Sequence, residues 1–325
     1  MNSFDLSRRG ALAAIAGAAA AAPMLSSAVL STANAAAPML GAMRPNVYRF
    51  PHGKFEVTTV FDGAVQFGGP HPIFGENMAA DEVAAYAEAN FLSGTKQEIG
   101  FTPVIVNTGS ELILFDTGNG EARRPARGNL VASIEAAGYT ADQIDTVVIT
   151  HMHPDHIGGM MEGGKPAFPN ARYITAQAEY DFWAADDKKE HRVGKLVQSN
   201  VVPVAEKFSF LGDGGSVASG VTAVAAFGHT PGHMAYHIES EGKRLLLIAD
   251  ACNHYVMSMQ KPDWHVKFDM DKAAAAATSK TLLGMAAADK IPMTGYHMPF
   301  PAIGFIEAQS GGGFRWNAAS YQMFL

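Results

Sequence analysis

The ten residues from Thr150 to Gly159, THMHPDHIGG, place three imidazoles and one carboxylate within six consecutive positions. The apolar run Thr146–Ile149 stands directly before them and predicts a buried strand that ends at this motif. Because side chains alternate along an extended backbone, His151 and His153 are expected to lie on the same side. Nitrogen ligands at this density favour a metal site over a histidine-rich surface loop.

Pro154 is expected to end the strand, which lets Asp155 and His156 turn back toward a second ion. One short loop can therefore provide ligands to two metals. Zinc and its first-row neighbours accept imidazole and carboxylate ligands, and two ions about 3.5–4 Å apart can share and activate one water molecule. The motif thus indicates a hydrolytic centre with two divalent ions, and zinc is the expected metal.

Three later residues each follow an apolar run and supply further ligand candidates: His229, Asp250 and His297. Glycines near His229 let the backbone approach a metal closely. Asp250 emerges from the apolar stretch Arg244–Ala249, where an unpaired charge would be costly. A bridging position between two cations removes that cost, so Asp250 is the expected shared ligand. His297, after the strand-like Met293–Tyr296, completes the second site.

The order His-x-His-x-Asp-His, then His, Asp and His, resembles the metallo-β-lactamase superfamily. The chain is most similar to the methyl parathion hydrolase and lactonase branch, and the resemblance extends from Tyr48 to Tyr321. The matching segments are Val106–Ser110, Asp116–Gly118, Ala136–Tyr139, Thr150–Gly159, Ala167–Ala171, Asp181–Trp183, Gly228–His233 and Phe300–Gly304. The resemblance implies an αββα sandwich, an α/β fold built as a single domain.

By this resemblance, the seven ligand candidates divide between two metals. One ion is held by His151, His153 and His229, the other by Asp155, His156 and His297, and Asp250 bridges both. Asp116 is implied as a buried carboxylate that supports the site, although Asp-Thr-Gly is equally compatible with an ordinary turn. The remaining histidines of interest are interpreted as structural: His71, His233, His237 and His265.

Two departures limit which activity can be carried over from the resemblance. The β-lactamases of the first class use a cysteine at the second metal, whereas Cys252, the only thiol, lies two residues after Asp250. Antibiotic hydrolysis is therefore disfavoured. The acyl-homoserine lactonases place a tyrosine three residues after the bridging aspartate, where this chain has Asn253. Asn253, His254 or Tyr255 could replace that phenol, or each could be an ordinary loop or packing residue.

The expected activity is hydrolysis by a hydroxide that bridges the two metals, because shared coordination lowers the pKa of water from ~15.7 toward ~7. Lactones and activated carboxylic esters are the favoured substrates, with phosphotriester hydrolysis as a side activity. Asp155 and Asp250 are the expected catalytic carboxylates, and Asp155 could carry a proton to the leaving alkoxide. The alternatives are a dedicated phosphotriesterase of the methyl parathion hydrolase type and a non-hydrolytic redox or sensor protein.

Several elements must position these residues. Strands are expected over residues 55–61, 102–107, 111–115 and 171–175, and helices over 129–137, 179–185 and 271–289. The stretch Gln66–Gly75, rich in Gly, Pro and aromatic residues, is expected to form an ordered loop above the metals. The residues predicted to line a substrate pocket, unless they fill the core, are Phe74, Trp183, Asn253, His254, Trp264 and Phe300.

The chain has 325 residues and 48% hydrophobic content, enough for one sizeable core, and the domain is expected to span residues 36–325. In residues 1–35, Arg8-Arg9 precedes an alanine-rich run and Ala33-Asn34-Ala35 offers a cleavage site, typical of a twin-arginine export signal. That run is shorter and less apolar than the ~20 residues a membrane span requires. A periplasmic or secreted protein without a stable membrane anchor is therefore expected.

Removal of that segment takes away two arginines and one aspartate, which changes the formal net charge from −7 to −8. The acidic balance, with no basic stripe or zinc-finger spacing, argues against a nucleic-acid partner. The expected partner is a small-molecule ester, lactone or phosphotriester, and the oligomeric state stays open, a homodimer included. One cysteine excludes an internal disulfide.

The interpretation of Cys252 as a packing residue leads to a direct test. Cys252→Ser is expected to keep the metal content of the protein and most of its activity, because a small buried thiol contributes mainly packing. Metal analysis of the purified variant checks this, with the unchanged protein as the reference. Loss of one metal would instead make Cys252 a ligand and contradict the bridging role of Asp250.

Overall fold

The computed structural model describes residue 39 and residues 43–324. The expected export signal, residues 1–35, lies outside the described residues. Arg44–Leu325 forms one compact unit. In the part of the chain that the structure describes, no helix is both long and apolar enough to cross a bilayer.

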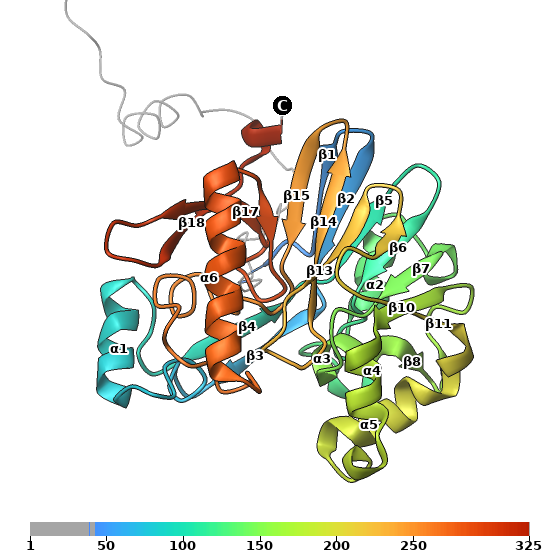
Figure 1. Cartoon of the computed structure of the whole chain (residues 1–325), viewed down its shortest axis with the longest axis horizontal. Coiled ribbons are helices and arrows are strands. Elements are labelled where there is room, and N and C mark those ends of the chain that lie inside the picture. Colours follow the sequence, from blue (N-terminus) through green and yellow to red (C-terminus); the bar gives the residue numbers. More distant parts are fainter. Residues whose placement is uncertain (1–38, 40–42, 325) are drawn as a thin grey trace, which may run out of the picture. The chain divides into compact units, whose positions relative to one another are not determined.

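The unit contains two seven-stranded sheets (Figure 1). In spatial order, the first sheet consists of β1 (Val47–His52), β2 (Phe55–Val60), β5 (Val104–Asn107), β6 (Leu112–Phe115), β7 (Thr146–Val148), β10 (Arg172–Ala176) and β11 (Phe208–Leu211). The second consists of β12 (Ser216–Ala218), β13 (Val221–Ala225), β14 (Met234–Ser240), β15 (Lys243–Leu247), β16 (Met293–Thr294), β17 (Ile303–Ala308) and β18 (Phe314–Ala318).

Two small two-stranded sheets and six α-helices accompany these sheets among the described residues. The small sheets pair β3 (Gly63–Phe67) with β4 (Gln97–Phe101) and β8 (Met161–Glu162) with β9 (Lys165–Pro166). The helices are α1 (Ala80–Ala89), α2 (Leu130–Ala136), α3 (Pro154–Ile157), α4 (Gln177–Ala184), α5 (Arg192–Asn200) and α6 (Lys272–Asp289).

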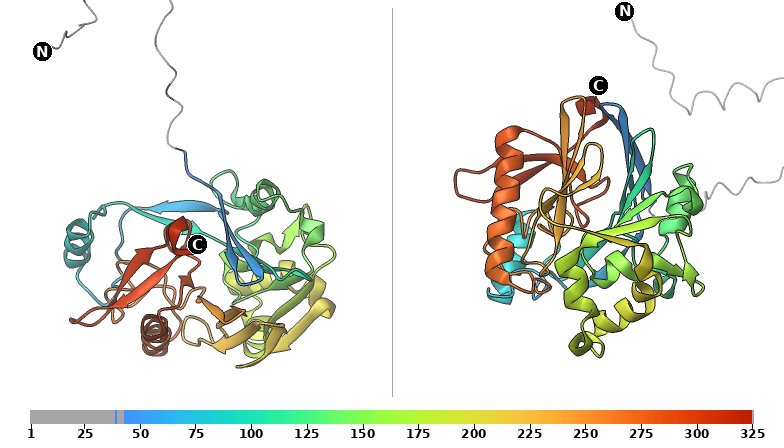
Figure 2. Two further views of the ribbon diagram at one scale, coloured as in Figure 1. Left: turned by 90° about the horizontal axis from the view of Figure 1, so that it is seen from above. Right: turned by 45° about the vertical axis from the view of Figure 1, so that its right-hand side comes forward.

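The sheets pack face to face with helices on both outer sides, an αββα sandwich (Figure 2). Side chains of α2, α4 and α5 share one core cluster with the outer face of the first sheet. Leu282 and Leu283 of α6 pack on the outer face of the second sheet. Strand β15 shows how the sequence creates two cores, since Leu245 and Leu247 point between the sheets while Leu246 points toward α6. The sandwich expected from the sequence is confirmed.

The strand directions bring the ends of several strands to one edge. In the first sheet, β6 and β7 run parallel, so the residues after Phe115 and Val148 emerge together. In the second sheet, β13 and β15 both run antiparallel to β14, and β15 runs parallel to β16. The segments after β7, β13, β15 and β16 carry the metal-ligand candidates. The topology therefore gathers residues that are far apart in the sequence.

Local structure differs from the sequence expectations in a few places. The strand expected over 102–107 begins only at Val104, and Thr102 and Pro103 lie between β4 and β5, because Pro103 has no N–H to continue a ladder. Gln66 and Phe67, expected in a loop, are the last residues of β3. The expected helix 271–289 is confirmed as α6, with the Asp271 side chain accepting a hydrogen bond from the N–H of Ala274 at 3.0 Å.

Candidate metal centre

The loop after β7 delivers the first histidines. His151 and His153 converge although the segment is no longer a strand, and their ring centroids lie 4.8 Å apart. His229, which follows β13, joins them with Nε2 at 2.9 Å from Nδ1 of His153. One ligand atom of each of these three residues lies within 4.8 Å of the others, as a shared metal ion requires. The structure thus brings together the first predicted group.

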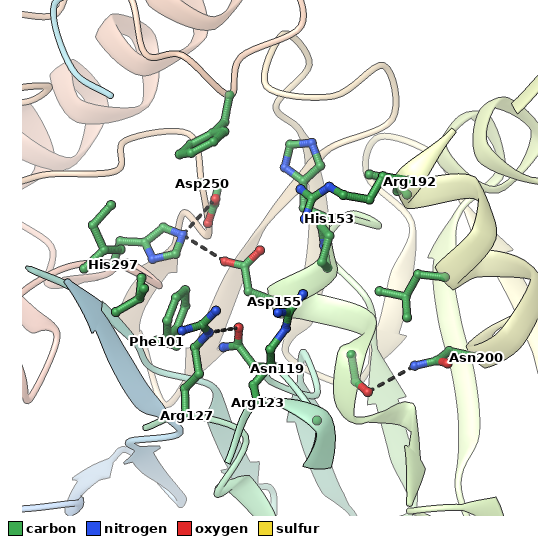
Figure 3. A pocket seen from close by; sticks show the side chains of 18 of the residues that line it. Phe101, Asn119, Arg123, Arg127, His153, Asp155, Arg192, Asn200, Asp250 and His297 are labelled. Carbon is green, nitrogen blue, oxygen red and sulfur yellow. Dashed lines mark hydrogen bonds and ion pairs between the residues drawn. The ribbon is translucent and has the colours of Figure 1, made fainter. Parts of the chain in front are cut away.

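The second predicted group forms where Pro154 begins α3 instead of a simple turn. Proline suits the first helical position, and the helix directs Asp155 and His156 to the same side as His297. Oδ2 of Asp155 lies 3.4 Å from Nε2 of His297 and 3.6 Å from Nε2 of His156. Figure 3 shows the His297 ring facing both Asp250 and Asp155, with a dashed line to each carboxylate.

Asp250 lies between the two groups. Its Oδ2 is 3.3 Å from Nε2 of His229 and 3.0 Å from Nε2 of His297, and its Oδ1 is 3.4 Å from Nε2 of His156. The carboxylate is buried, with 4% of its side chain exposed. The preceding residue, Ala249, has a φ of 45°, a conformation that costs a non-glycine residue roughly 1–2 kcal/mol. This geometry suits a ligand shared by two cations.

The remaining ring nitrogens of these histidines are held by hydrogen bonds. Nδ1 of His156 donates to Asp116, Nδ1 of His229 to Asp269 and Nδ1 of His297 to the carbonyl of Gly100, at 2.7–2.9 Å. A carboxylate or carbonyl oxygen can only accept, so each Nδ1 carries a proton, and Nε2 is the ring nitrogen that is left to bind a metal when the ring is neutral. Metal-binding histidines are typically oriented in this way.

Three polar atoms in this cluster are buried without a hydrogen-bond partner: Nε2 of His151, Nε2 of His156 and Oδ1 of Asp250. Buried polar atoms rarely remain unpaired, because the loss of water is then uncompensated. Here all three face one another across the site. A cation between them would use these lone pairs, so the residues present fit two divalent metals.

Burial and neighbouring charges shift the pKa values of the site residues in opposite directions. Burial lowers the pKa of His151 well below its usual value, and the charge of His156 lowers it further. Burial also disfavours the charged form of His156, but the carboxylates of Asp116 and Asp250 outweigh it and raise its pKa well above normal. Burial would raise the pKa of Asp250, yet His297 and His156 hold it well below its usual value. The centre therefore keeps Asp250 ionised, the form that binds metal.

A buried glutamate that the sequence analysis did not single out holds the loop after β7 and the loop after β13 in place. Glu179 is fully buried and accepts hydrogen bonds from Met152 N–H, between His151 and His153, and from Thr230 Oγ1 and Gly232 N–H, beyond His229. Its position on α4 gave no motif, and only the tertiary contacts show the role. Asp269 was also not predicted, because its role depends on a tertiary contact: its Oδ1 lies 2.7 Å from Nδ1 of His229.

Asp116 supports the site rather than only forming a turn. Its carboxylate accepts hydrogen bonds from Thr150 N–H at 2.8 Å, Thr150 Oγ1 at 2.9 Å and His156 Nδ1 at 2.9 Å. A φ of 63° turns the chain here, which aspartate tolerates better than most residues. A Cβ at Gly159 would overlap the carbonyl of Thr117, so the glycine pair of the motif allows the two loops to pack.

A cavity of about 1300 Å³ opens over the centre. Of the predicted pocket residues, Phe74, Trp183 and Asn253 line it. Trp183 is only 3% exposed and its Nε1 donates to Glu179, so it serves mainly as packing. Asn253 occupies the position of the lactonase tyrosine, and its amide donates to Oδ2 of Asp250 at 3.1 Å.

The other three predicted pocket residues lie elsewhere, which corrects the sequence expectation. His254 is buried against Phe74 and its Nδ1 accepts from Val256 N–H, while burial lowers its pKa to about 3. Trp264 packs edge-on against Tyr86, and Phe300 packs on Phe61. The spacing of residues in the sequence could not reveal that these aromatic side chains pack between secondary-structure elements instead of facing the cavity.

Cys252 and His233 are structural, as the sequence analysis expected. The Cys252 thiol is 2% exposed and does not belong to the metal-ligand groups, and burial raises its pKa to about 12. His233 donates through Nδ1 to the carbonyl of Ala226 and accepts at Nε2 from Asp250 N–H, so both ring nitrogens are satisfied. Its second bond holds the backbone of Asp250 in place.

Removal of the shared carboxylate tests the centre as a whole. Asp250→Ala is expected to lower the metal content below two ions per chain and to abolish activity, because two cations would then face each other without compensation. Metal analysis with parallel circular dichroism separates this effect from unfolding. Two retained metals and normal turnover would reassign Asp250 to a packing role.

Because Asp116 supports a metal-ligand candidate and is not one itself, its substitution is expected to weaken metal binding without abolishing it. Asp116→Asn keeps the size and backbone tolerance of the side chain but removes the carboxylate that accepts from His156, so metal affinity is expected to fall about 10–100-fold. Competition with a chelator measures it. Asp142→Asn, at an exposed position, is the control. Unaltered affinity in Asp116→Asn would leave Asp116 as a turn residue.

Part of the sequence of this chain is similar to the sequences of known lactonases. Two N-acyl homoserine lactonases, from Bacillus cereus and Azorhizobium caulinodans, are 29% and 31% identical over 37% of this chain, covering 42% and 46% of those proteins. The chain thus matches less than half the length of these curated relatives.

Solved structures share the fold over most of the chain. AidC, a dizinc quorum-quenching lactonase solved with a product, is 26% identical with a TM-score of 0.77, covering 85% of this chain and 98% of AidC. The hydrolase AbOPH is 23% identical with a TM-score of 0.79, covering 86% and 99%, which shows the fold alone. The family model of the metallo-beta-lactamase superfamily matches residues 102–287. With that match over more than half of its length, this chain belongs to the metallo-beta-lactamase superfamily.

Proposed function

We propose that this protein is a metal-dependent hydrolase of lactones and carboxylic esters. The observation that carries the proposal is the meeting of two three-residue ligand groups at Asp250, on the floor of a cavity with an apolar wall. The lactonases among its relatives support the choice of substrate. Bound zinc ions would supply Lewis acidity and would lower the pKa of water toward ~7.

The residues of the chain provide the remaining functions. Asp155 is the more exposed of the two central carboxylates, with 22% of its side chain exposed compared with 4% for Asp250. It can therefore reach the leaving alkoxide and deliver a proton. Asn253 lines the cavity and presents an amide beside Asp250. That amide can orient the substrate carbonyl where the homoserine lactonases have a phenol.

The apolar part of the substrate has a defined place. The cavity is lined by Phe67 and Phe101, from the two-stranded sheet β3–β4, and by Phe268 and Met270, from the segment before α6. Phe268 and Met270 are 43% and 46% exposed, so both have surface available to a ligand. Burial of an acyl or alkyl chain there would contribute about 25 cal/mol per Å² of apolar surface. No such driving force exists for a small polar ester.

Substrate length provides the test. Phe268→Ala is expected to lower kcat/KM for a long-chain lactone about tenfold more than for a small lactone, because only the longer substrate reaches the ring. The zinc-supplemented protein is assayed in parallel with an aryl ester and methyl parathion. Phe210→Ala, at a site 38% exposed and away from the cavity, is the matched control.

Activity on methyl parathion without lactone or ester turnover would reject the proposed substrate class. Equal losses on long and short lactones would show that the chain does not bind beside Phe268. The metal content of each variant is measured alongside the activity. It is expected to be unchanged in Phe268→Ala, because Phe268 does not belong to the metal-ligand groups.

A further inference from the structure

The cavity carries an excess of positive charge away from the metal centre. Four cationic side chains line it: Arg123, Arg127, Arg192 and Lys267. Apart from the two central carboxylates and Asp269, which holds His229, Glu121 is the one carboxylate among the lining residues. The whole chain is acidic, with a formal charge of −7, so this positive surface is local.

The three arginines differ from the other described arginines. Five of those pair with a carboxylate: Arg44 with Glu98, Arg124 with Glu162, Arg172 with Glu111, Arg244 with Asp289 and Arg315 with Glu307. Arg49 donates instead to Thr58 and to the carbonyl of Ala137. Among residues 43–324, no carboxylate lies within ion-pair distance of Arg123, Arg127 or Arg192, and all three line the cavity.

Arg127 is held in a fixed orientation toward this space. Its Nε donates to Oδ1 of Asn119 at 3.0 Å, and its guanidinium lies 6.0 Å from the centre of the Phe101 ring. Burial lowers the pKa of Arg127, and the neighbouring charge of Arg123 lowers it further. Asp62, a nearby carboxylate, is already occupied by N–H donors from Asn119, Gly128 and Leu130. The charges of Asp155 and Asp62 act on Arg127 in the opposite direction, but neither carboxylate forms an ion pair with its guanidinium.

The arginines approach the reaction site from two sides. Figure 3 shows Arg123 and Arg127 beneath Asp155, while Arg192, from the start of α5, reaches toward His153. Guanidinium groups bind carboxylates and phosphates with paired, directional N–H donors. The apolar wall at Phe101 lies beside Arg127. A ligand could thus bury an alkyl segment and place an anionic end on the arginines.

We propose that Arg123, Arg127 and Arg192 form an anion subsite, and that the substrate of this hydrolase carries a carboxylate or phosphate group in addition to its ester or lactone. The assignment rests on the proposed function for the bond that is cleaved. The subsite itself is a binding property, so binding measurements can test it without turnover.

Matched lactones test the preference for an anionic substrate. A γ-lactone with a pentyl side chain is compared with one bearing an ω-carboxybutyl side chain. The unchanged protein is expected to have the higher kcat/KM on the anionic lactone, and Arg127→Gln and Arg192→Gln are each expected to lower the ratio about tenfold. Arg127→Lys, which keeps the charge but not the paired donors, should lie between. Arg315→Gln, in an exposed ion pair away from the cavity, should leave the ratio unchanged.

Titration calorimetry on the zinc-supplemented protein measures the affinity of the subsite for anions independently of turnover. Suberate is expected to bind more tightly than octanoate, and the difference should disappear in Arg127→Gln and Arg192→Gln. 8-Phosphonooctanoate, which carries a phosphonate at the far end of the octanoate chain, is used in a third titration, and whichever of these two ligands, suberate or the phosphonate, binds more tightly identifies the preferred anion as carboxylate or phosphate. Equal affinities for octanoate, suberate and 8-phosphonooctanoate, with unchanged lactone ratios, would overturn the subsite. Arginine-dependent binding without hydrolysis of either lactone would support the subsite and reject the proposed function.

Discussion

The burial of Asp250 is the constraint on which this structure depends. A carboxylate that is 4% exposed, at the end of an apolar strand, is stable only if positive charge surrounds it. Histidines from both sheets provide that environment, with His156 from the first sheet and His229 and His297 from the second. The two halves of the sandwich must therefore stay in register for the charge to be compensated.

Further buried carboxylates surround the centre and support it. Asp116 links the loop after β6 to Thr150 and His156, and Glu179 links the loops after β7 and β13. Each accepts several N–H or O–H donors, so the cost of its burial is offset by hydrogen bonds within the fold. The metal-ligand candidates are consequently positioned by other loops and by α4, rather than by their own strands alone. Such support reduces the reorganisation needed when a metal binds.

The cavity combines three chemical environments within one space. It is lined by the His and Asp clusters, by aromatic and aliphatic side chains, and by three arginines that form no ion pair with a carboxylate. An apolar wall alone would favour hydrophobic substrates without discrimination, since burial of apolar surface is non-directional. Asn253 and Arg127 can impose orientation, because each is held in place by a hydrogen bond within the chain and its other N–H groups donate only along fixed directions.

The sandwich and the seven metal-ligand candidates that meet in the structure were both predictable from the sequence, because histidine and aspartate at the ends of apolar runs have few stable alternatives. The sequence also indicated α6 and the structural nature of Cys252. It could not decide the role of Asp116, the burial of Trp183 or the absence of His254, Trp264 and Phe300 from the cavity wall. Nor did it point to Glu179 or the three arginines. Those roles depend on contacts between residues distant in the chain, and only the tertiary structure decides which side chains remain unpaired and face the cavity.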